Sequence, residues 1–451
     1  MEISFFTHAC LLINHNNTSI LTDPWLEGGA FNNSWGLLNE LSYDEIENKI
    51  QRNFFIYLSH EHPDHLSIGF FKKNQNSLIA KNCTVLFQKT ADKRVINFLS
   101  SLNIKTMEVD FEKKLNLDNN LNITLYKCGF FDSAAIIETK DTTLFNLNDC
   151  DFNNNELNKI ALNHSNNNNN KILATQFSYA AWRENEEWCK RAADLKINKI
   201  NYFSKVLKCN YLYPFASFIF FKKKENFFLN KNSNKPWELL QEKFISNLIL
   251  PYPNTNNFKE VLKNDEIRKK NNELSSIYWK AQWEKNVKVD NEIENNYNID
   301  DFIEEVKKKF LVYKSKNLEK NSFVFMKILN LISFNIFFKS ITFEINLLNL
   351  FITLGLDKII IEKDLPKNKP LLSIDPDVFL HFISTEYGLD SLIVGARFKT
   401  KDKKFMEKFI LSFGHLFLNQ IGKGISLKLL FDFFLWKHFT VIFFRLIKKE
   451  R

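Results

Sequence analysis

The fold of this chain is decided by one short stretch, Ser59-His60-Glu61-His62-Pro63-Asp64-His65. Three of the nine histidines in the 451-residue sequence fall within it, beside an aspartate. It directly follows Phe54–Leu58, a continuous apolar run typical of a strand that is buried on both faces. Residues two apart in an extended segment point to the same side, so His60 and His62 are placed to hold one ion through imidazole nitrogens.

Asp64 and His65 follow the turn at Pro63 and are placed to face a second, neighbouring ion. Imidazole and carboxylate ligands suit zinc, iron or manganese. Such an ion lowers the pKa of its bound water to about 7 and supplies hydroxide at neutral pH. We therefore predict a metal-dependent enzyme with one or two zinc ions, or with iron or manganese instead. Asp64 is expected to be a ligand or the catalytic base. The alternative, a His-rich surface turn, is not expected directly after a buried strand.

The His60–His65 loop resembles the H-x-H-x-D-H motif of the metallo-β-lactamase superfamily. Leu21–Trp25 ahead of the loop and Leu147–Asp149 after it match the superfamily in the same order. Within the superfamily, the chain looks closest to the lactonase-like branch that contains CMP-N-acetylneuraminate hydroxylase. That closer resemblance rests on Thr7–Leu11, Asp23–Leu26, Leu147–Cys150, Gln176–Ser178, Pro214–Phe218 and Glu225–Phe227, and it covers about residues 1–250.

The resemblance implies a four-layer αββα sandwich in which Asp149 is the carboxylate that bridges the ions. Asp23 is expected outside the ligand set, orienting a ligating imidazole. His8 is expected beside the metal pocket, with a packed, hydrogen-bonded histidine as the alternative. The hydroxylase of this branch also carries a Rieske domain built from C-x-H and C-x-x-H. This sequence contains neither pattern, so we expect no Rieske cluster of its own.

Two family histidines have no match here. Where the superfamily has the third histidine of its first ion, this chain reads Cys128-Gly129-Phe130-Phe131-Asp132-Ser133. Asp132 or Cys128 is predicted to substitute, with a turn-capping carboxylate and a core thiol as the alternatives. The family's last histidine is also missing, since His164 lies in an Asn-rich stretch and the three later histidines lie beyond residue 380. The predicted ligands are therefore His60, His62, Asp64, His65, Asp132 and Asp149, and the number of ions stays open.

A change in residue pattern along the sequence predicts two domains. Residues 1–253 read as short strands joined by polar turns, with a mobile polar loop at 153–170 and a helix at 179–194. Tyr179, Trp182 and Arg183 at the start of that helix are either substrate-pocket residues or packing residues. Residues 254–301 are charged and Asn-rich, which indicates a linker or an exposed helical excursion.

Residues 302–451 alternate apolar helices with short strands, such as 371–374 and 392–398. We expect a C-terminal α/β domain there. It weakly resembles sterol-carrier domains, and an ordinary packing or dimerisation domain is the alternative, which leaves a homo-oligomer open. The Phe-rich segment 427–447 is expected to be a buried amphipathic helix, with a membrane-surface helix as the alternative.

Composition narrows the class of partner. The net charge is +9, but the lysines are scattered, which favours solvated faces over a nucleic-acid surface. Six cysteines without a C-x-x-C pair argue against a disulfide framework and for a reducing compartment. No signal peptide and no apolar run of 18 uncharged residues is evident. We expect a cytoplasmic protein with a small-molecule substrate, no nucleic-acid partner and no integral membrane segment.

Three functions remain open from the sequence. The first is a hydrolase that acts on a small ester, lactone or amide, sugar-derived by analogy with the branch. The second is an iron-dependent oxygenase or hydroxylase that receives electrons from a separate partner. The third is a binding protein with a degenerate site, because two family histidines are absent.

Overall fold

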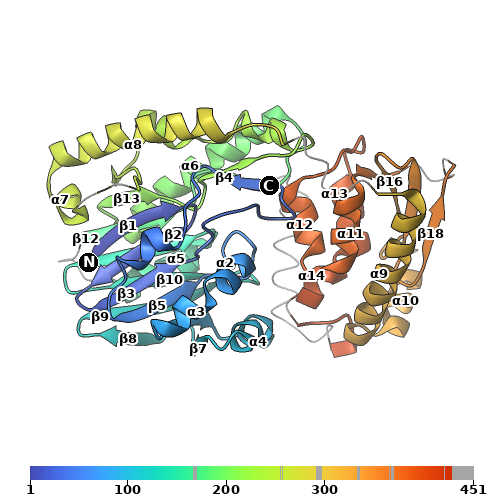
Figure 1. Cartoon of the computed structure of the whole chain (residues 1–451), viewed down its shortest axis with the longest axis horizontal. Coiled ribbons are helices and arrows are strands. Elements are labelled where there is room, and N and C mark those ends of the chain that lie inside the picture. Colours follow the sequence, from blue (N-terminus) through green and yellow to red (C-terminus); the bar gives the residue numbers. More distant parts are fainter. Residues whose placement is uncertain are drawn as a thin grey trace. The chain divides into compact units, whose positions relative to one another are not determined.

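The computed structural model describes residues 1–165, 170–253, 255, 257–290, 297–332, 336–364, 366, 370–420 and 422–428. Two compact units make up the chain, each with its own core (Figure 1). The first unit comprises Met1–Lys222 and Leu229–Lys288, and the second comprises Lys223–Phe228 and Val289–Arg451.

A six-stranded sheet carries the His60–His65 loop. Its order is β1 (Glu2–Thr7), β2 (Cys10–His15), β3 (Thr18–Thr22), β5 (Asn53–Leu58), β6 (Thr84–Gln88) and β7 (Lys105–Val109). The first three strands are antiparallel neighbours, whereas β3, β5, β6 and β7 run parallel. The strand predicted at 54–58 is β5, and it lies between two parallel neighbours. Its continuous apolar run is explained because parallel strands need cover on both faces.

A seven-stranded sheet lies opposite. Its order is β15 (Asn247–Leu248), β13 (Tyr211–Pro214), β12 (Asn170–Thr175), β11 (Thr142–Asn148), β10 (Asp132–Glu138), β9 (Leu121–Cys128) and β8 (Lys114–Asp118). The hairpin predicted ahead of Asp149 is present as β10 and β11, with Ile136 opposite Phe145. A further small sheet pairs β4 (Trp35–Leu37) with β14 (Ile219–Phe221).

Helices cover the outer faces of both large sheets. The first sheet packs Leu12, Ile56 and Leu58 against Phe71 and Leu78, which lie on α2 (Ile68–Lys73) and α3 (Gln75–Ala80). Two further helices, α1 (Asp44–Glu47) and α4 (Arg94–Ser101), add to that layer. The second sheet is covered by α5 (Asn154–Asn163) and α6 (Glu186–Leu207). The predicted αββα sandwich is therefore confirmed, and Figure 1 shows the strands of this unit between their helices.

Two local predictions in the first unit were wrong. The polar loop expected at 153–170 contains α5, whose start is a reciprocal cap: the Asn153 side chain accepts from the Glu156 N–H and Glu156 accepts from the Asn153 N–H. Leu157 and Ile160 bury the apolar face of this helix. The helix expected from residue 179 begins only at Glu186, after the Asn185 cap. Residues 179–185 are thereby left as a loop.

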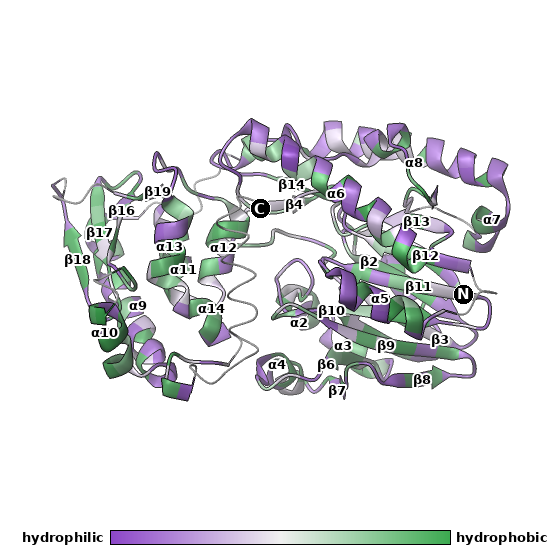
Figure 2. Cartoon of the chain, turned by 180° about the vertical axis from the view of Figure 1, so that it is seen from behind, coloured by the Kyte–Doolittle hydropathy of each residue, from purple (hydrophilic) through white to green (hydrophobic). Residues whose placement is uncertain are grey.

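The stretch expected as a linker or exposed helical excursion is helical but not exposed along its length. It forms α7 (Phe258–Lys263) and α8 (Asp265–Asn286), and Figure 2 shows α8 as hydrophilic with interspersed hydrophobic residues. Trp279 is 0% exposed, its ring lies 4.5 Å from that of Phe218, and its indole N–H donates to the Pro251 carbonyl at 2.6 Å. The first unit therefore continues to Lys288, past the boundary expected at 253.

The second unit is an α/β structure around a four-stranded sheet of order β18 (Ile359–Glu362), β17 (Leu350–Leu354), β16 (Ile341–Ile345) and β19 (Leu372–Ile374). Its helices are α9 (Ile299–Lys320), α10 (Phe323–Ile332), α11 (Pro376–Ser384), α12 (Gly388–Gly395), α13 (Phe405–Phe413) and α14 (His415–Gln420). Phe343 of β16 packs its ring against those of Phe379, Phe382 and Phe409. The strand expected at 392–398 is wrong, because α12 occupies most of it.

The segment 427–447, expected as an amphipathic helix, lies outside the described residues from residue 429 onward. Among the helices that the structure describes, none has the length and apolar character needed to cross a bilayer.

The placement of α8 gives a testable prediction. Replacing the buried Trp279 with Ala should lower the free energy of unfolding of the first unit by about 3–5 kcal/mol, since a large cavity opens between α8 and the sheet. Replacing Ile277 of the same helix, which is 69% exposed, should change it by less than about 0.5 kcal/mol. Urea denaturation followed by circular dichroism measures both. Equal effects of the two substitutions would show that α8 is a detached excursion.

Candidate metal centre

The His60–His65 loop begins where β5 ends and turns inward at once. The backbone N–H groups of His65 and Leu66 both donate to the carbonyl oxygen of His62, at 3.0 and 2.8 Å. His60, Asp64 and His65 are 1%, 2% and 0% exposed. This burial rules out the alternative of a His-rich surface turn.

His60 and His62 do lie on the same side of the loop. Nε2 of His60 is 2.9 Å from Nδ1 of His62, and the ligand atoms of His60, His62 and Asp64 all lie within 4.8 Å of one another. Asp132, the first residue of β10, places a carboxylate oxygen 3.8 Å from Nε2 of His60. The second sheet thus contributes the Asp132 carboxylate to the group of candidate ligands that includes His60 and His62, which follow a strand of the first sheet.

His65 joins this group to a second one. Its Nε2 lies 3.3 Å from a carboxylate oxygen of Asp64 and 3.4 Å from one of Asp149. Asp149 directly follows β11, so the hairpin returns it to the edge where β5 delivers the loop. The ligand atoms of His60, His65 and Asp149 again lie within 4.8 Å of one another.

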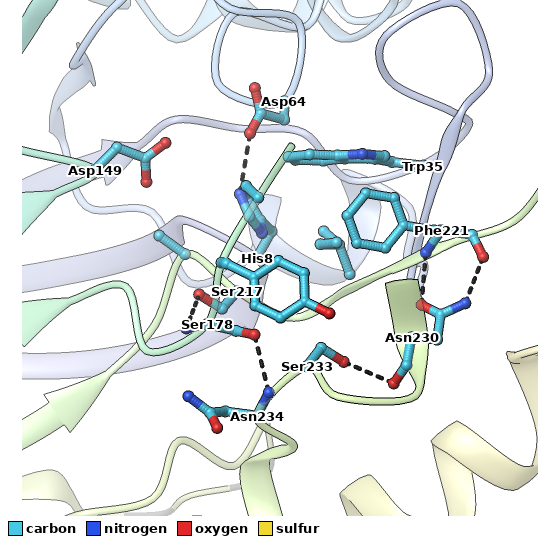
Figure 3. Close-up of a pocket in the computed structure, with 14 residues that line it drawn as sticks. His8, Trp35, Asp64, Asp149, Ser178, Ser217, Phe221, Asn230, Ser233 and Asn234 are labelled. Carbon is cyan, nitrogen blue, oxygen red and sulfur yellow. Dashed lines mark hydrogen bonds and ion pairs between the residues drawn. The ribbon is translucent and has the colours of Figure 1, made fainter. Parts of the chain in front are cut away.

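His8 completes the second group from the turn between β1 and β2. Its Nε2 lies 3.3 Å from a carboxylate oxygen of Asp64 (Figure 3). The ligand atoms of His8, Asp64 and His65 form a third set within 4.8 Å. The turn is held firmly, because the Thr7 hydroxyl donates to the Trp25 carbonyl and the Ala216 N–H donates to the His8 carbonyl. The family resemblance implied a place for His8 beside the pocket but not among the ligands. In the residues themselves, its only signal was a polar side chain at a turn flanked by apolar strands.

Asp23 holds the centre from behind. It follows β3, is 0% exposed, and accepts from the Ser59 N–H and hydroxyl, both at 2.8 Å, and from the Asn148 amide at 2.6 Å. Nδ1 of His65 is 3.1 Å from the same carboxylate. This contact fixes the imidazole so that Nε2 faces Asp64 and Asp149. Asp23 therefore has the orienting geometry expected of it, and it does not lie among the ligand groups.

Several polar atoms at the centre are buried and make no hydrogen bond of good geometry: both ring nitrogens of His8, Nε2 of His65, Oδ1 of Asp64 and Oδ1 of Asp149. The two Nε2 atoms have only their ion-pair contacts, with Asp64 at 3.3 Å for each and with Asp149 at 3.4 Å for His65. Buried polar atoms are nearly always hydrogen-bonded, so a convergence of exceptions calls for a binding partner. Nitrogen and carboxylate donors that converge within metal-ligand range fit a zinc, iron or manganese ion.

Burial and mutual charge set the pKa values here. Burial, aided by the charge of His65, lowers the pKa of His60 to about 4, which keeps that imidazole neutral, as a metal ligand must be. Burial raises the pKa of Asp132 to about 6. Burial would also raise the pKa of Asp149, but the neighbouring His65 outweighs it and lowers the value to about 2. For His65 itself, the carboxylates of Asp64 and Asp149 overcome burial and raise the pKa.

The other residues singled out in the sequence lie around the centre or away from it. Cys128 is buried in the core between the sheets and belongs to none of the ligand groups among the described residues. His164 lies 3.0 Å from a Glu138 carboxylate oxygen and 3.0 Å from the Tyr126 hydroxyl, so it is engaged elsewhere on the second sheet. Tyr179 lines the pocket beside the centre, and Arg183 lies over its ring at 5.7 Å.

Comparison with known proteins agrees with this fold. Residues 2–178 match the family model described as "Beta-lactamase superfamily domain". The cytidine monophosphate-N-acetylneuraminic acid hydroxylase of Xenopus laevis is 30% identical over 156 residues, which is 33% of this chain and 26% of that protein. The human protein of that name, described as inactive, is 29% identical over 157 residues, 33% of this chain and 30% of its own length. The match thus spans roughly a quarter to a third of these relatives.

Solved structures show the same kind of likeness at low identity. A possible metal-dependent hydrolase from Veillonella parvula is 16% identical with a TM-score of 0.40, covering 56% of this chain and 98% of that one. The diiron β-hydroxylase CmlA from Streptomyces venezuelae is 15% identical with a TM-score of 0.35, covering 48% and 44%. The resemblance to the metallo-β-lactamase superfamily and to its hydroxylase-containing branch is confirmed, whereas the reaction is not settled by these relatives.

The position of Asp23 predicts an effect without contact to any ion. Replacing Asp23 with Ala should lower the affinity for Zn²⁺ by about 10–100-fold, because His65 loses the partner that orients it. Competition with a chromogenic chelator measures this affinity. Asp110, a surface carboxylate paired with Lys89 and Lys113, is the control, and its replacement with Ala should leave the affinity unchanged. An Asp23→Ala protein that is folded and binds Zn²⁺ as the parent does would contradict the orienting role.

Proposed function

We propose that this chain is a metal-dependent hydrolase that cleaves a small ester, lactone or amide, with a sugar-derived substrate as one candidate. The observation that carries the proposal is the convergence of His8, Asp64, His65 and Asp149, each of which has at least one buried ring or carboxylate atom without a hydrogen bond. When bound there, a zinc ion would lower the pKa of water to about 7 and so supply hydroxide at neutral pH.

In this proposal the chain divides its ligands between two ions. His60 and His62, with Asp132 in place of the missing third histidine, would hold the first ion. Asp64, His65 and His8 would hold the second, and Asp149 would serve as a ligand shared by the two groups. His8 then does the work of the family's last histidine from the opposite end of the domain. Asp64 is placed to accept a proton where it does not serve as a ligand.

The surroundings of the centre support a small-molecule substrate. The adjoining pocket is lined by Trp35, Tyr179 and Phe221 on its apolar side and by serine and asparagine side chains on its polar side. Such a mixture of apolar walls and a few placed polar groups is typical of small-ligand sites. All six cysteines are buried free thiols, which supports a reducing compartment such as the cytoplasm.

A second candidate is an iron-dependent hydroxylase that works with a separate electron donor. It is favoured by one observation, the 30% identity to proteins named as hydroxylases. Histidine and carboxylate ligands without thiolate suit iron as well as zinc, so the ligand set does not decide between the two reactions.

Metal analysis joined to an activity screen tests the proposed function. Protein purified anaerobically should contain zinc, and the zinc form should hydrolyse at least one member of a panel of ester, lactone and amide substrates. A double variant with His60→Ala and His62→Ala should lose most of its bound metal and this hydrolysis while keeping its far-ultraviolet circular dichroism. Redox-active iron together with an absence of hydrolysis across the panel would favour the hydroxylase instead.

The assignment of His8 has its own test. The parent protein should bind two Co²⁺ ions per chain. The His8→Ala variant should bind one, because the second ion loses a ligand that no other residue of its proposed ligand group replaces. Titration calorimetry and elemental analysis give the stoichiometry. His15, at the far end of the same strand pair, is the matched control, and its replacement with Ala should leave two ions. Two ions of unchanged affinity in His8→Ala would remove His8 from the ligand set.

A further inference from the structure

The pocket beside the metal centre has a second polar wall, which is formed by serine and asparagine residues and not by the candidate metal ligands. His8, Asp64 and Asp149 form one side of this pocket, and Ser178, Ser217 and Asn234 line another (Figure 3). The cavity itself measures about 20 Å³. Because one water needs about 10–15 Å³, only a small terminal group of a larger ligand can fill it.

The Ser217 hydroxyl has one hydrogen-bonding capacity left. Its oxygen accepts from the backbone N–H groups of Phe177 and Ser178, both at 3.1 Å. A hydroxyl has two acceptor positions and one donor, so only its proton is still unused. Within the part of the chain that the structure describes, no protein acceptor lies within hydrogen-bond range of that proton, although Ser217 is only 8% exposed.

Ser178 repeats this arrangement. Its oxygen accepts from the Asn234 N–H at 3.0 Å, its side chain is buried with the residue 5% exposed, and again no described residue accepts its proton. Ser233, on the same pocket, differs because its hydroxyl donates to the Asn230 carbonyl at 3.0 Å. Two neighbouring hydroxyls therefore offer donors to whatever enters the cavity, and a third does not.

The charge of the lining decides what kind of oxygen these donors receive. Among the described residues that line the pocket there is no lysine or arginine, and the acidic side chains are Asp64 and Asp149 on the metal side. The serine wall therefore supplies no cation of its own, and an anion in this pocket would be drawn to the metal side, where the proposed function places the ions. A neutral carbonyl oxygen has the two lone pairs that two hydroxyl donors require and is not drawn away from them by a net charge.

We infer that Ser178 and Ser217 bind a neutral carbonyl group of the substrate through their two hydroxyl protons. This inference rests on the proposed function, because it places that carbonyl beside the metal centre.

The test measures binding of acetamide to the full-length, zinc-loaded protein by saturation-transfer NMR, with acetate as the charged counterpart. Ser178→Ala should weaken acetamide binding about tenfold but leave acetate binding unchanged, because a carboxylate would bind chiefly to the metal ions. Ser233→Ala is the matched control and should leave it unchanged. Ser217→Cys keeps an acceptor for the two backbone N–H groups but a poorer donor, so it should weaken binding without unfolding the protein.

Unchanged acetamide binding in Ser178→Ala and Ser217→Cys would overturn the inference. It would also be overturned if acetate bound more tightly than acetamide and both substitutions weakened the binding of acetate. The result is independent of turnover. If no panel substrate is hydrolysed but acetamide binding depends on both serines, the proposed reaction fails and the carbonyl site stands. If hydrolysis is found and acetamide binding does not depend on the serines, the proposed reaction stands and the carbonyl site fails.

Discussion

The buried carboxylate of Asp23 is the constraint on which the rest of the first unit depends. It lies at the end of a strand of one sheet and receives the Asn148 amide from the end of a strand of the other, at 2.6 Å. A carboxylate that is 0% exposed is tolerated only when its oxygens are fully hydrogen-bonded, and Ser59, Asn148 and His65 meet this need. The same bonds fix where the two sheet edges meet. The metal-ligand loop is thus positioned by the requirement to satisfy one buried charge.

The sequence predicted the parts of this arrangement that are local. A strand buried on both faces, followed at once by closely spaced histidines, predicted β5 and its loop, and the hairpin before Asp149 predicted β10 and β11. His8 could not be assigned as a ligand, because its neighbour Asp64 is 56 positions away and only the pairing of β1, β2, β3 and β5 in one sheet brings them together. Asn-rich composition concealed α5, although Asn153 and Glu156 form its cap. Trp279 could not be placed, since its burial depends on distant Phe5 and Phe218.

Hydrolysis and oxygen chemistry use similar protein ligands, so what distinguishes them in this fold must lie outside the ligand set. The choice of ion is one such factor, because imidazole and carboxylate accept several. The wall opposite the ions is another. Hydroxyl donors at Ser178 and Ser217 are fixed by backbone N–H groups that need them as acceptors, so the wall is organised before any ligand arrives. A centre that admits several metals is thereby paired with a recognition surface that admits few chemical groups.

The atoms left without hydrogen bonds around His8, Asp64, His65 and Asp149 have a consequence for the life of the protein in the cell. Each such atom lowers the stability of the folded protein without metal, and an ion that binds all of them removes this loss. Ligand binding to the native state alone raises its population by mass action. Metal supply would then govern how much of the newly made chain stays folded and escapes proteases, so that abundance as well as activity follows the availability of the ion.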